Sequence, residues 1–390
     1  MNNLSITHYI ATMLDSMNIT DFLEPVNIAH VSNDEGYQDG QVGKMIICYE
    51  EHFPDLMNID IVIVGCGEYR GELAGNAYMD APTEIRQAFY KLYYWHKDVR
   101  IADIGNVKKG AGLTDTYAAL KTVLKELVDA GKLVVILGGS HDLALAQYYA
   151  FADKRNVVEA VTIDALIDID MDAVQKSKQF LMEVLTSEPN YVRHYSHIGF
   201  QSYLVHPGML ETMDKLRFDC YRTGHVKENI EEMEPVFRNS QFMSFDISAI
   251  ASAYAPANDL TPNGFSGEES CALMRYAGMS QQMKTIGIYG YHPAKDVNGL
   301  TAKQISHMLW YLVDGKSKGA KESPIDERTG FNEFHTVFSE VDTTFLQSKR
   351  TGRWWMQLPD QQYIACSYKD YMLASTNEIP ERWLRAQERS

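Results

Sequence analysis

Short apolar segments that alternate with helical segments are the feature that most restricts what this sequence can fold into. The apolar segments are expected to be strands because they are short and rich in β-branched or aromatic residues. The segments between them have helical periodicity and are expected to be helices. Strands that alternate with helices form a parallel sheet covered on both faces. The sequence therefore predicts an α/β protein, a three-layer α/β/α domain with a central, mainly parallel sheet. The expected strands are 59–65, 133–137, 157–163, 196–200, 241–246 and 284–289, and the expected helices are 81–93, 114–130, 266–276 and 301–313, with another that begins near residue 143.

Local signals support several helix boundaries. Pro82 suits a first helical turn, where its missing N–H costs nothing. Gly131 is a helix stop after residue 130. Thr301 and Gln304 have the spacing of a capping box.

Three parts of the chain are expected. Residues 1–58 are predicted to be an irregular N-terminal extension packed on the domain, 59–315 the α/β domain, and 316–390 a C-terminal appendage packed on the same domain. The appendage is rich in aromatic residues, and we expect its adjacent Trp354 and Trp355 to serve packing rather than sugar binding.

Charge and cysteine content exclude some classes of partner. The formal net charge of −16 disfavours nucleic acid and anionic membrane surfaces, which would repel the chain. No apolar run is long enough to span a bilayer, and the N-terminus shows no signal-peptide pattern. The five cysteines are scattered without a CxxC pair, which favours a reducing compartment. A cytoplasmic protein without a membrane or nucleic-acid partner is expected.

Polar residues follow three of the predicted strands. His141 comes after a glycine pair, Asp164 and Asp168 follow strand 157–163, and Asp246 ends strand 241–246. Functional groups of such a sheet gather beyond the carboxyl ends of its strands. One histidine nitrogen and three carboxylates suit a hard or borderline divalent cation such as manganese. The competing interpretation is that Asp164 and Asp168, which share one face of an extended backbone, are solvated strand-end acids.

Three short motifs resemble the metal motifs of the arginase (ureohydrolase) family. They are Gly138-Gly-Ser-His141, Asp164-Ala-Leu-Ile-Asp168 and Ser244-Phe-Asp246. The segments 81–86, 198–203 and 348–355 are similar to its formimidoylglutamase branch, and the resemblance covers most of the chain from Ile59. It implies the α/β/α fold, an oligomer, a small-molecule substrate, and hydrolysis of a guanidino or formimino C–N bond by a hydroxide that bridges two manganese ions.

The sequence departs from that family at several positions, among them Ala251-Ser252 where the third family motif ends in Asp-Pro. Where the family has Asp, His, Asp and a substrate-recognising Glu, this chain has Ser140, Leu166, Ser248 and Gly290. Leucine offers no lone pair, and serine is a poor substitute for a carboxylate. The resemblance thus implies one broken metal site beside one intact site, with manganese expected, zinc as the alternative and no organic cofactor. The residues it assigns to the intact site are His141, Asp164, Asp168 and Asp246.

One bound ion is still sufficient to lower the pKa of water towards neutrality. We therefore predict Asp168 as the catalytic residue, serving both as ligand and as hydrogen-bond acceptor for the water. His194 and His292 are candidate proton shuttles, but a surface position is the favoured interpretation of both.

Three hypotheses about function remain open at this point. They are a hydrolase of the formimidoylglutamase type, a one-metal hydrolase with a changed substrate, and a non-catalytic binding or assembly protein. If the pocket is otherwise intact, the combined changes Leu166→His, Ser248→Asp and Gly290→Glu are expected to create or raise ureohydrolase activity.

Overall fold

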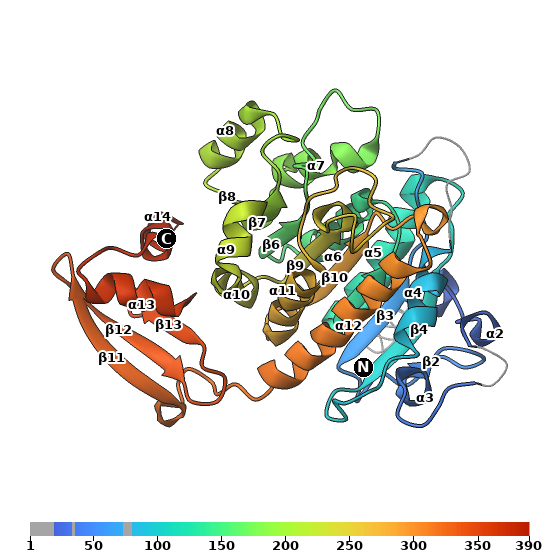
Figure 1. Ribbon diagram of the computed structural model, residues 1–390, viewed down its shortest axis with the longest axis horizontal. Helices are drawn as coiled ribbons and strands as arrows, with labels where there is room; N and C mark the ends of the chain where they lie inside the picture. The colour runs from blue at the N-terminus through green and yellow to red at the C-terminus, as the bar shows by residue number, and fades with distance from the viewer. Residues whose placement is uncertain (1–18, 33–35, 73–79, 390) are drawn as a thin grey trace, which may run out of the picture.

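A ten-stranded sheet forms the centre of the molecule (Figure 1). The computed structural model describes residues 19–32, 36–72 and 80–389. The strand order is β1-β4-β3-β5-β10-β9-β6-β7-β8, with β2 also paired to β4, and every pairing is parallel except that of β1 with β4. The strands are β1 (Leu23–Glu24), β2 (Ile47–Cys48), β3 (Ile61–Gly65), β4 (Ile101–Val107), β5 (Leu133–Leu137), β6 (Val158–Ile163), β7 (Val192–Phe200), β8 (Asp219–Arg222), β9 (Phe242–Asp246) and β10 (Thr285–Tyr289).

Alternate residues of the buried strands enter two separate cores. Ile61 and Ile63 of β3 pack in one core with α4 (Ala81–Phe89), α11 (Gly267–Met279) and α12 (Leu300–Gly319). Val62 and Val64 pack in the other with α5 (Leu113–Asp129), α6 (Ala144–Ala152) and α7 (Phe180–Thr186). The predicted three-layer α/β/α architecture is confirmed. The remaining helices of this region are α2 (Ile28–Val31), α3 (Val42–Met45), α8 (Pro207–Lys215), α9 (Thr223–Glu228) and α10 (Glu234–Arg238).

Several predicted boundaries and one predicted cap were wrong. β7 begins at Val192 rather than at residue 196, and α12 ends at Gly319 rather than at residue 313. The helix expected to run from residue 81 to 93 ends at Phe89. Thr301 and Gln304 do not form a capping box, because the Thr301 hydroxyl accepts a hydrogen bond from the Ala257 N–H (3.0 Å) and the Gln304 amide donates to the Gly267 carbonyl (2.9 Å). Both side chains are therefore used to hold α12 against its neighbours. A capping box does occur at the start of α11, between Ser266 and Glu269.

The edges of the sheet contain strands that the sequence did not suggest. β4 was missed because Asp103 and Asn106 interrupt its apolar pattern, and β8 because it is only four residues long. β1 and β2 come from the predicted N-terminal extension and pair with β4, so this part of the chain extends the sheet edge. Residues 1–18 of that extension lie outside the described residues.

The C-terminal segment forms a second, antiparallel sheet beside the α/β body (Figure 1). Its order is β11-β12-β13-β14, and Phe345, Trp354 and Met356 lie in its own hydrophobic core. Trp354 stacks on Tyr371 with ring centroids 5.0 Å apart, which confirms a packing role. The elements are β11 (Phe331–Phe338), β12 (Val341–Ser348), β13 (Trp354–Gln357), β14 (Tyr363–Cys366), α13 (Tyr368–Ser375) and α14 (Glu381–Arg389).

Two buried arginines join the second sheet to the α/β body. The Arg238 guanidinium lies 4.4 Å from the centroid of the Trp355 ring and donates to the Trp354 carbonyl (2.6 Å). Arg353 pairs with Glu322 (2.9 Å) and donates to the Met279 carbonyl (3.1 Å). Trp355 is therefore a packing residue of this junction.

In the part of the chain that the structure describes, no helix is both long enough and apolar enough to cross a membrane.

Candidate metal centre

A glycine turn carries His141 from the end of β5 to the carboxyl edge of the sheet. Gly138 and Gly139 both have φ of +86°, a left-handed conformation that favours glycine. A Cβ on Gly139 would lie 2.7 Å from the Cys66 carbonyl oxygen, so the close approach of the two backbones also requires glycine there. His141 then begins a single 3-10 turn, His141–Leu143, and is buried.

Asp164 and Asp168 lie beyond the end of β6 at Ile163, so the alternation of an extended strand does not orient them. They are nevertheless only 3% and 6% exposed, which excludes the interpretation of solvated strand-end acids. His197 Nε2 lies 3.1 Å from the Asp164 carbonyl oxygen. Burial lowers the pKa of His197 to about 4, so this ring is neutral and donates that hydrogen bond, which positions Asp164.

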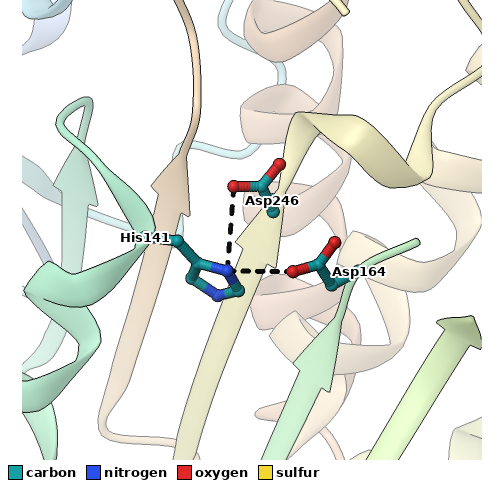
Figure 2. Close-up of side chains that lie close together, drawn as sticks. All are labelled: His141, Asp164 and Asp246. Atoms are coloured by element: carbon teal, nitrogen blue, oxygen red, sulfur yellow. Dashed lines mark ion pairs between the residues drawn. The ribbon is translucent and has the colours of Figure 1, made fainter. Parts of the chain in front are cut away.

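The four predicted ligands converge on one nitrogen. His141 Nδ1 lies 3.0 Å from Asp164 Oδ2, 3.0 Å from Asp168 Oδ2 and 3.7 Å from Asp246 Oδ2. Figure 2 shows His141, Asp164 and Asp246 turned toward one another from three separate segments, and their ligand atoms lie within 4.8 Å of one another. Asp168 adjoins this group, because its Oδ2 lies 3.0 Å from His141 Nδ1. The arrangement brings together groups more than 100 residues apart in sequence.

The surroundings of His141 suit a metal ligand. Its Nε2 lies 3.2 Å from the Ser244 hydroxyl, which is itself 3.0 Å from the Thr162 hydroxyl. With Nε2–H donating to Ser244, the lone pair of Nδ1 is directed at the carboxylates. Nδ1 is buried, and its 3.0 Å contacts with Asp164 Oδ2 and Asp168 Oδ2 do not have the geometry of hydrogen bonds, so among the described residues none satisfies it as a hydrogen-bond partner. A divalent cation would satisfy this nitrogen, so the donor set fits a metal ion.

The charges of the group lead to the same conclusion. Burial, together with the charge of Asp164, raises the pKa of Asp168 well above its ordinary range and that of Asp246 to about 7. Burial alone would lower the pKa of His141, but Asp164 and Asp168 raise it well above its ordinary value. Two buried carboxylates, Asp164 and Asp168, and the partly buried carboxylate of Asp246 therefore require protons or a cation for compensation. A divalent ion would supply that compensation.

The other oxygen of both Asp164 and Asp246 is held by hydrogen bonds. The Ser248 hydroxyl donates to Asp164 Oδ1 (2.5 Å), as does the Leu166 N–H (3.0 Å). The Ser248 N–H donates to Asp246 Oδ1 (2.8 Å). The Oδ2 atoms of both carboxylates thus face His141. Their Oδ1 atoms are held by Leu166 and Ser248, two of the positions at which this chain departs from the family motifs.

The structure argues against Gly290→Glu as a restoring change. Gly290 has φ of +78°, and a Cβ there would lie 2.7 Å from Asp246 Oδ2 and 2.8 Å from Oδ1. Any side chain at this position would displace a predicted metal ligand. The combined change stays a prediction, and Gly290→Glu is its least favourable part because it requires Asp246 to move.

The two histidines weighed as proton shuttles are buried, so the predicted surface positions were wrong. His194 Nε2 lies 2.9 Å from Asp219 Oδ2 at the amino-terminal half of β7, beside a cavity of about 940 Å³ that is lined also by β8, β14 and α14. None of the four predicted ligands lines that cavity. His292 follows β10 on the carboxyl edge and contacts Glu72. Only His292 is on the same side of the sheet as the candidate metal centre.

Sequence reasoning missed several supporting residues. Ser244 could have been found, because it lies two residues before Asp246 in the same strand and so shares its face. Thr162, His197 and Glu72 carried no signal in the sequence, because their roles depend on contacts between distant segments.

The fold and this donor set define a class of protein, the α/β/α proteins that carry a metal centre at the carboxyl ends of parallel strands. This chain belongs to the arginase family, whose model matches residues 59–314. The match ends before β11, so the second sheet lies outside it.

Similar proteins include several formimidoylglutamases. The formimidoylglutamase of Halobacterium salinarum is 25% identical over 287 residues, covering 65% of this chain and 89% of that protein. That of Staphylococcus aureus strain MRSA252 is 22% identical over 245 residues, covering 60% of this chain and 78% of that protein.

Solved structures show the same fold. A formiminoglutamase of Trypanosoma cruzi solved with Mn²⁺ has a TM-score of 0.63 at 14% identity, covering 72% of this chain and 99% of that chain. The formimidoylglutamase of Bacillus subtilis also has a TM-score of 0.63, at 16% identity, covering 77% of this chain and 98% of that chain. The resemblance to formimidoylglutamases that the motifs suggested is therefore confirmed.

Proposed function

We propose that this protein is a one-metal hydrolase that cleaves the C–N bond of a small amidine or guanidino compound, as the names of its formimidoylglutamase relatives suggest. The residues that would hold the ion are His141, Asp164, Asp168 and Asp246. Manganese is the expected ion, because three of the four ligands are oxygens and one relative was solved with Mn²⁺.

One observation carries the proposal of a single ion. Ser248 and the Leu166 N–H hold the Oδ1 atoms of Asp164 and Asp246, whereas both Oδ2 atoms lie near His141 Nδ1. An ion on the Oδ1 side would have to break these hydrogen bonds and would gain only a neutral hydroxyl as a new ligand. An ion on the Oδ2 side requires no such loss.

The residues around the site divide the work of hydrolysis. A bound divalent ion lowers the pKa of water and polarises the carbon under attack. Asp168 would serve both as a ligand and as the hydrogen-bond acceptor for the water, since its Oδ2 lies 3.0 Å from His141 Nδ1 and so belongs to the same group of donor atoms. Ser244 keeps the imidazole oriented throughout.

Metal content and turnover together test the proposal. We expect about one ion per chain after loading with manganese, and hydrolysis of formimidoyl-glutamate, arginine or agmatine above the rate in buffer. Asp246→Asn serves as the matched variant and should lose both the ion and the activity. Two ions per chain in the unaltered protein would refute the single site.

The non-catalytic hypothesis makes a different prediction. A binding or assembly protein would hold one ion yet release no ammonia or amine from any of the three substrates. In that result the metal centre would stand, and the hydrolase proposal would be rejected.

A further inference from the structure

A glutamate and a histidine form an isolated pair on the carboxyl side of the sheet. His292 Nε2 lies 3.1 Å from Glu72 Oε1 and 3.2 Å from Glu72 Oε2. The Glu72 side chain is 27% exposed and that of His292 is 5% exposed. The imidazole is thus buried, whereas the carboxylate reaches solvent.

The pair lies next to the candidate metal centre. Gly290 packs directly against the Asp246 carboxylate, and His292 follows two residues later, within about 8 Å of chain. The His292 ring also contacts the Tyr69 ring, with centroids 4.7 Å apart, and Tyr69 comes from the loop after β3 that carries Glu72. Two loops that meet beside Asp246 therefore hold this carboxylate.

Glu72 differs from the other acids that surround the site. Glu68 is paired with Arg70 and accepts a hydrogen bond from Thr116, and Asp142 is fully buried and bonded to Tyr117. Within the described ranges, Glu72 has no arginine or lysine partner, and its only side-chain partner is His292. One nitrogen placed almost equally far from both oxygens leaves lone pairs free on each of them.

We infer that Glu72 is the carboxylate that binds the cationic amidinium or guanidinium group of the substrate beside the metal centre. This inference rests on the proposed function and names the residue that would select a cation over a neutral amide. His292 acts as a positioning residue, holding the carboxylate from its buried side.

The chemistry of the two groups is complementary. An amidinium is planar and presents two parallel N–H donors, which a carboxylate accepts in a bidentate manner. A neutral amide of the same size carries no charge and has N–H donors on one nitrogen only. It therefore binds a carboxylate much more weakly. Position 290 itself has no room for a side chain, whereas the loop after β3 supplies the Glu72 carboxylate through its contact with His292, two residues further along the chain.

Binding of acetamidinium tests the inference without requiring turnover. Ligand-observed NMR on the zinc-loaded protein would compare acetamidinium with acetamide, its neutral isostere. We expect Glu72→Gln to weaken acetamidinium binding at least about 10-fold, the loss typical of one charge-assisted pair, and to leave acetamide unaffected. Exposed Glu126→Gln on α5 is the control and should bind both compounds as the unaltered protein does.

The zinc content and the thermal midpoint of Glu72→Gln should equal those of the unaltered protein, which excludes misfolding as the cause. Unchanged acetamidinium affinity in Glu72→Gln, or an absence of acetamidinium binding to the unaltered protein, would overturn the inference. If Glu72→Gln loses the preference for acetamidinium but the unaltered protein turns over no substrate, the Glu72 subsite stands and only the hydrolase proposal is rejected. If the unaltered protein turns over a substrate and the KM is the same in Glu72→Gln, the hydrolase proposal stands and the Glu72 subsite is rejected.

Discussion

Ser248 is the residue on which our proposal of a single ion most depends. It donates to two of the predicted ligands, with its hydroxyl to Asp164 and its N–H to Asp246. A carboxylate in place of this hydroxyl would face Asp164 directly and would need a cation between the two acids. In our proposal, an aspartate at position 248 would add negative charge to the site and so favour a second ion, whereas serine does not.

The double variant Leu166→His, Ser248→Asp tests this dependence. We expect metal content to rise from about one to about two ions per chain, because the change adds an imidazole and a carboxylate where no strong ligand existed. Elemental analysis after manganese loading is the measurement. Leu166→His alone should remain near one ion, and a double variant that also remains there would contradict the interpretation of Ser248.

Ser244 supports His141 without touching the ion in our proposal. Ser244→Ala removes the acceptor for Nε2–H, so we expect the metal affinity to fall by about 10- to 100-fold. Competition with a chromophoric chelator would measure the change. Ser240→Ala is a suitable control, since the Ser240 hydroxyl bonds to the Val236 carbonyl and not to the site. Equal affinity in both variants would show that Ser244 does not orient the ring.

At the scale of elements, a buried ion pair fixes α4 to the sheet edge. Arg86 donates to both oxygens of Asp103 on β4, at 2.7 and 2.9 Å, and to Asn106 at 2.6 Å. Tyr90 donates to the same Asp103 carboxylate at 2.8 Å. Arg86 and Asp103 are almost completely buried, so neither charge has solvent to replace a lost partner.

Breaking that pair should be costly. Arg86→Met leaves the Asp103 charge uncompensated, and we expect the free energy of unfolding to fall by about 3–5 kcal/mol. Urea denaturation followed by circular dichroism would report it. Exposed Arg100→Met should change stability by no more than about 0.5 kcal/mol. A loss below about 1 kcal/mol in Arg86→Met would mean that the site relaxes or admits water.

At the scale of the whole molecule, Glu322 connects the α/β body to the second sheet. It pairs with Arg353 and accepts hydrogen bonds from Ser348 (2.5 Å) and Thr351. Burial alone would raise the pKa of Glu322, but these hydrogen bonds and the Arg353 charge lower it below its ordinary value of 4.5. The ionised carboxylate is thus the form that stabilises the folded protein.

The sign of that shift predicts acid lability of the junction. The contribution of Glu322 is complete above about pH 4.5 and is lost as the pH falls through its lowered pKa. Glu322→Gln should therefore be less stable than the unaltered protein near pH 7, and the difference should shrink towards about pH 3. Urea unfolding monitored by tryptophan fluorescence at several pH values would show it. Exposed Glu327→Gln should give no such convergence, and a pH-independent difference in Glu322→Gln would contradict the assignment.

Much of the central fold was predictable because its inner strands have a local signature. β3, β5 and β10 are buried on both faces and are consequently apolar throughout, so each is visible in a few consecutive residues. β4 was missed for the opposite reason. Its Asp103 is tolerated in a buried strand only because Arg86 reaches it from α4, a contact between distant segments.

The same distinction holds for the candidate site. By itself, the sequence determined that His141, Asp164, Asp168 and Asp246 follow parallel strands, and parallel strands present their carboxyl ends at one edge. Only the tertiary structure decided that the Asp164 and Asp168 carboxylates are buried, that Ser248 holds the oxygens a second ion would need, and that Gly290 admits no side chain. The physical reason is that hydrogen bonding, burial and steric space depend on which distant segments come into contact. The apolar pattern that predicts a strand depends only on a few neighbouring residues.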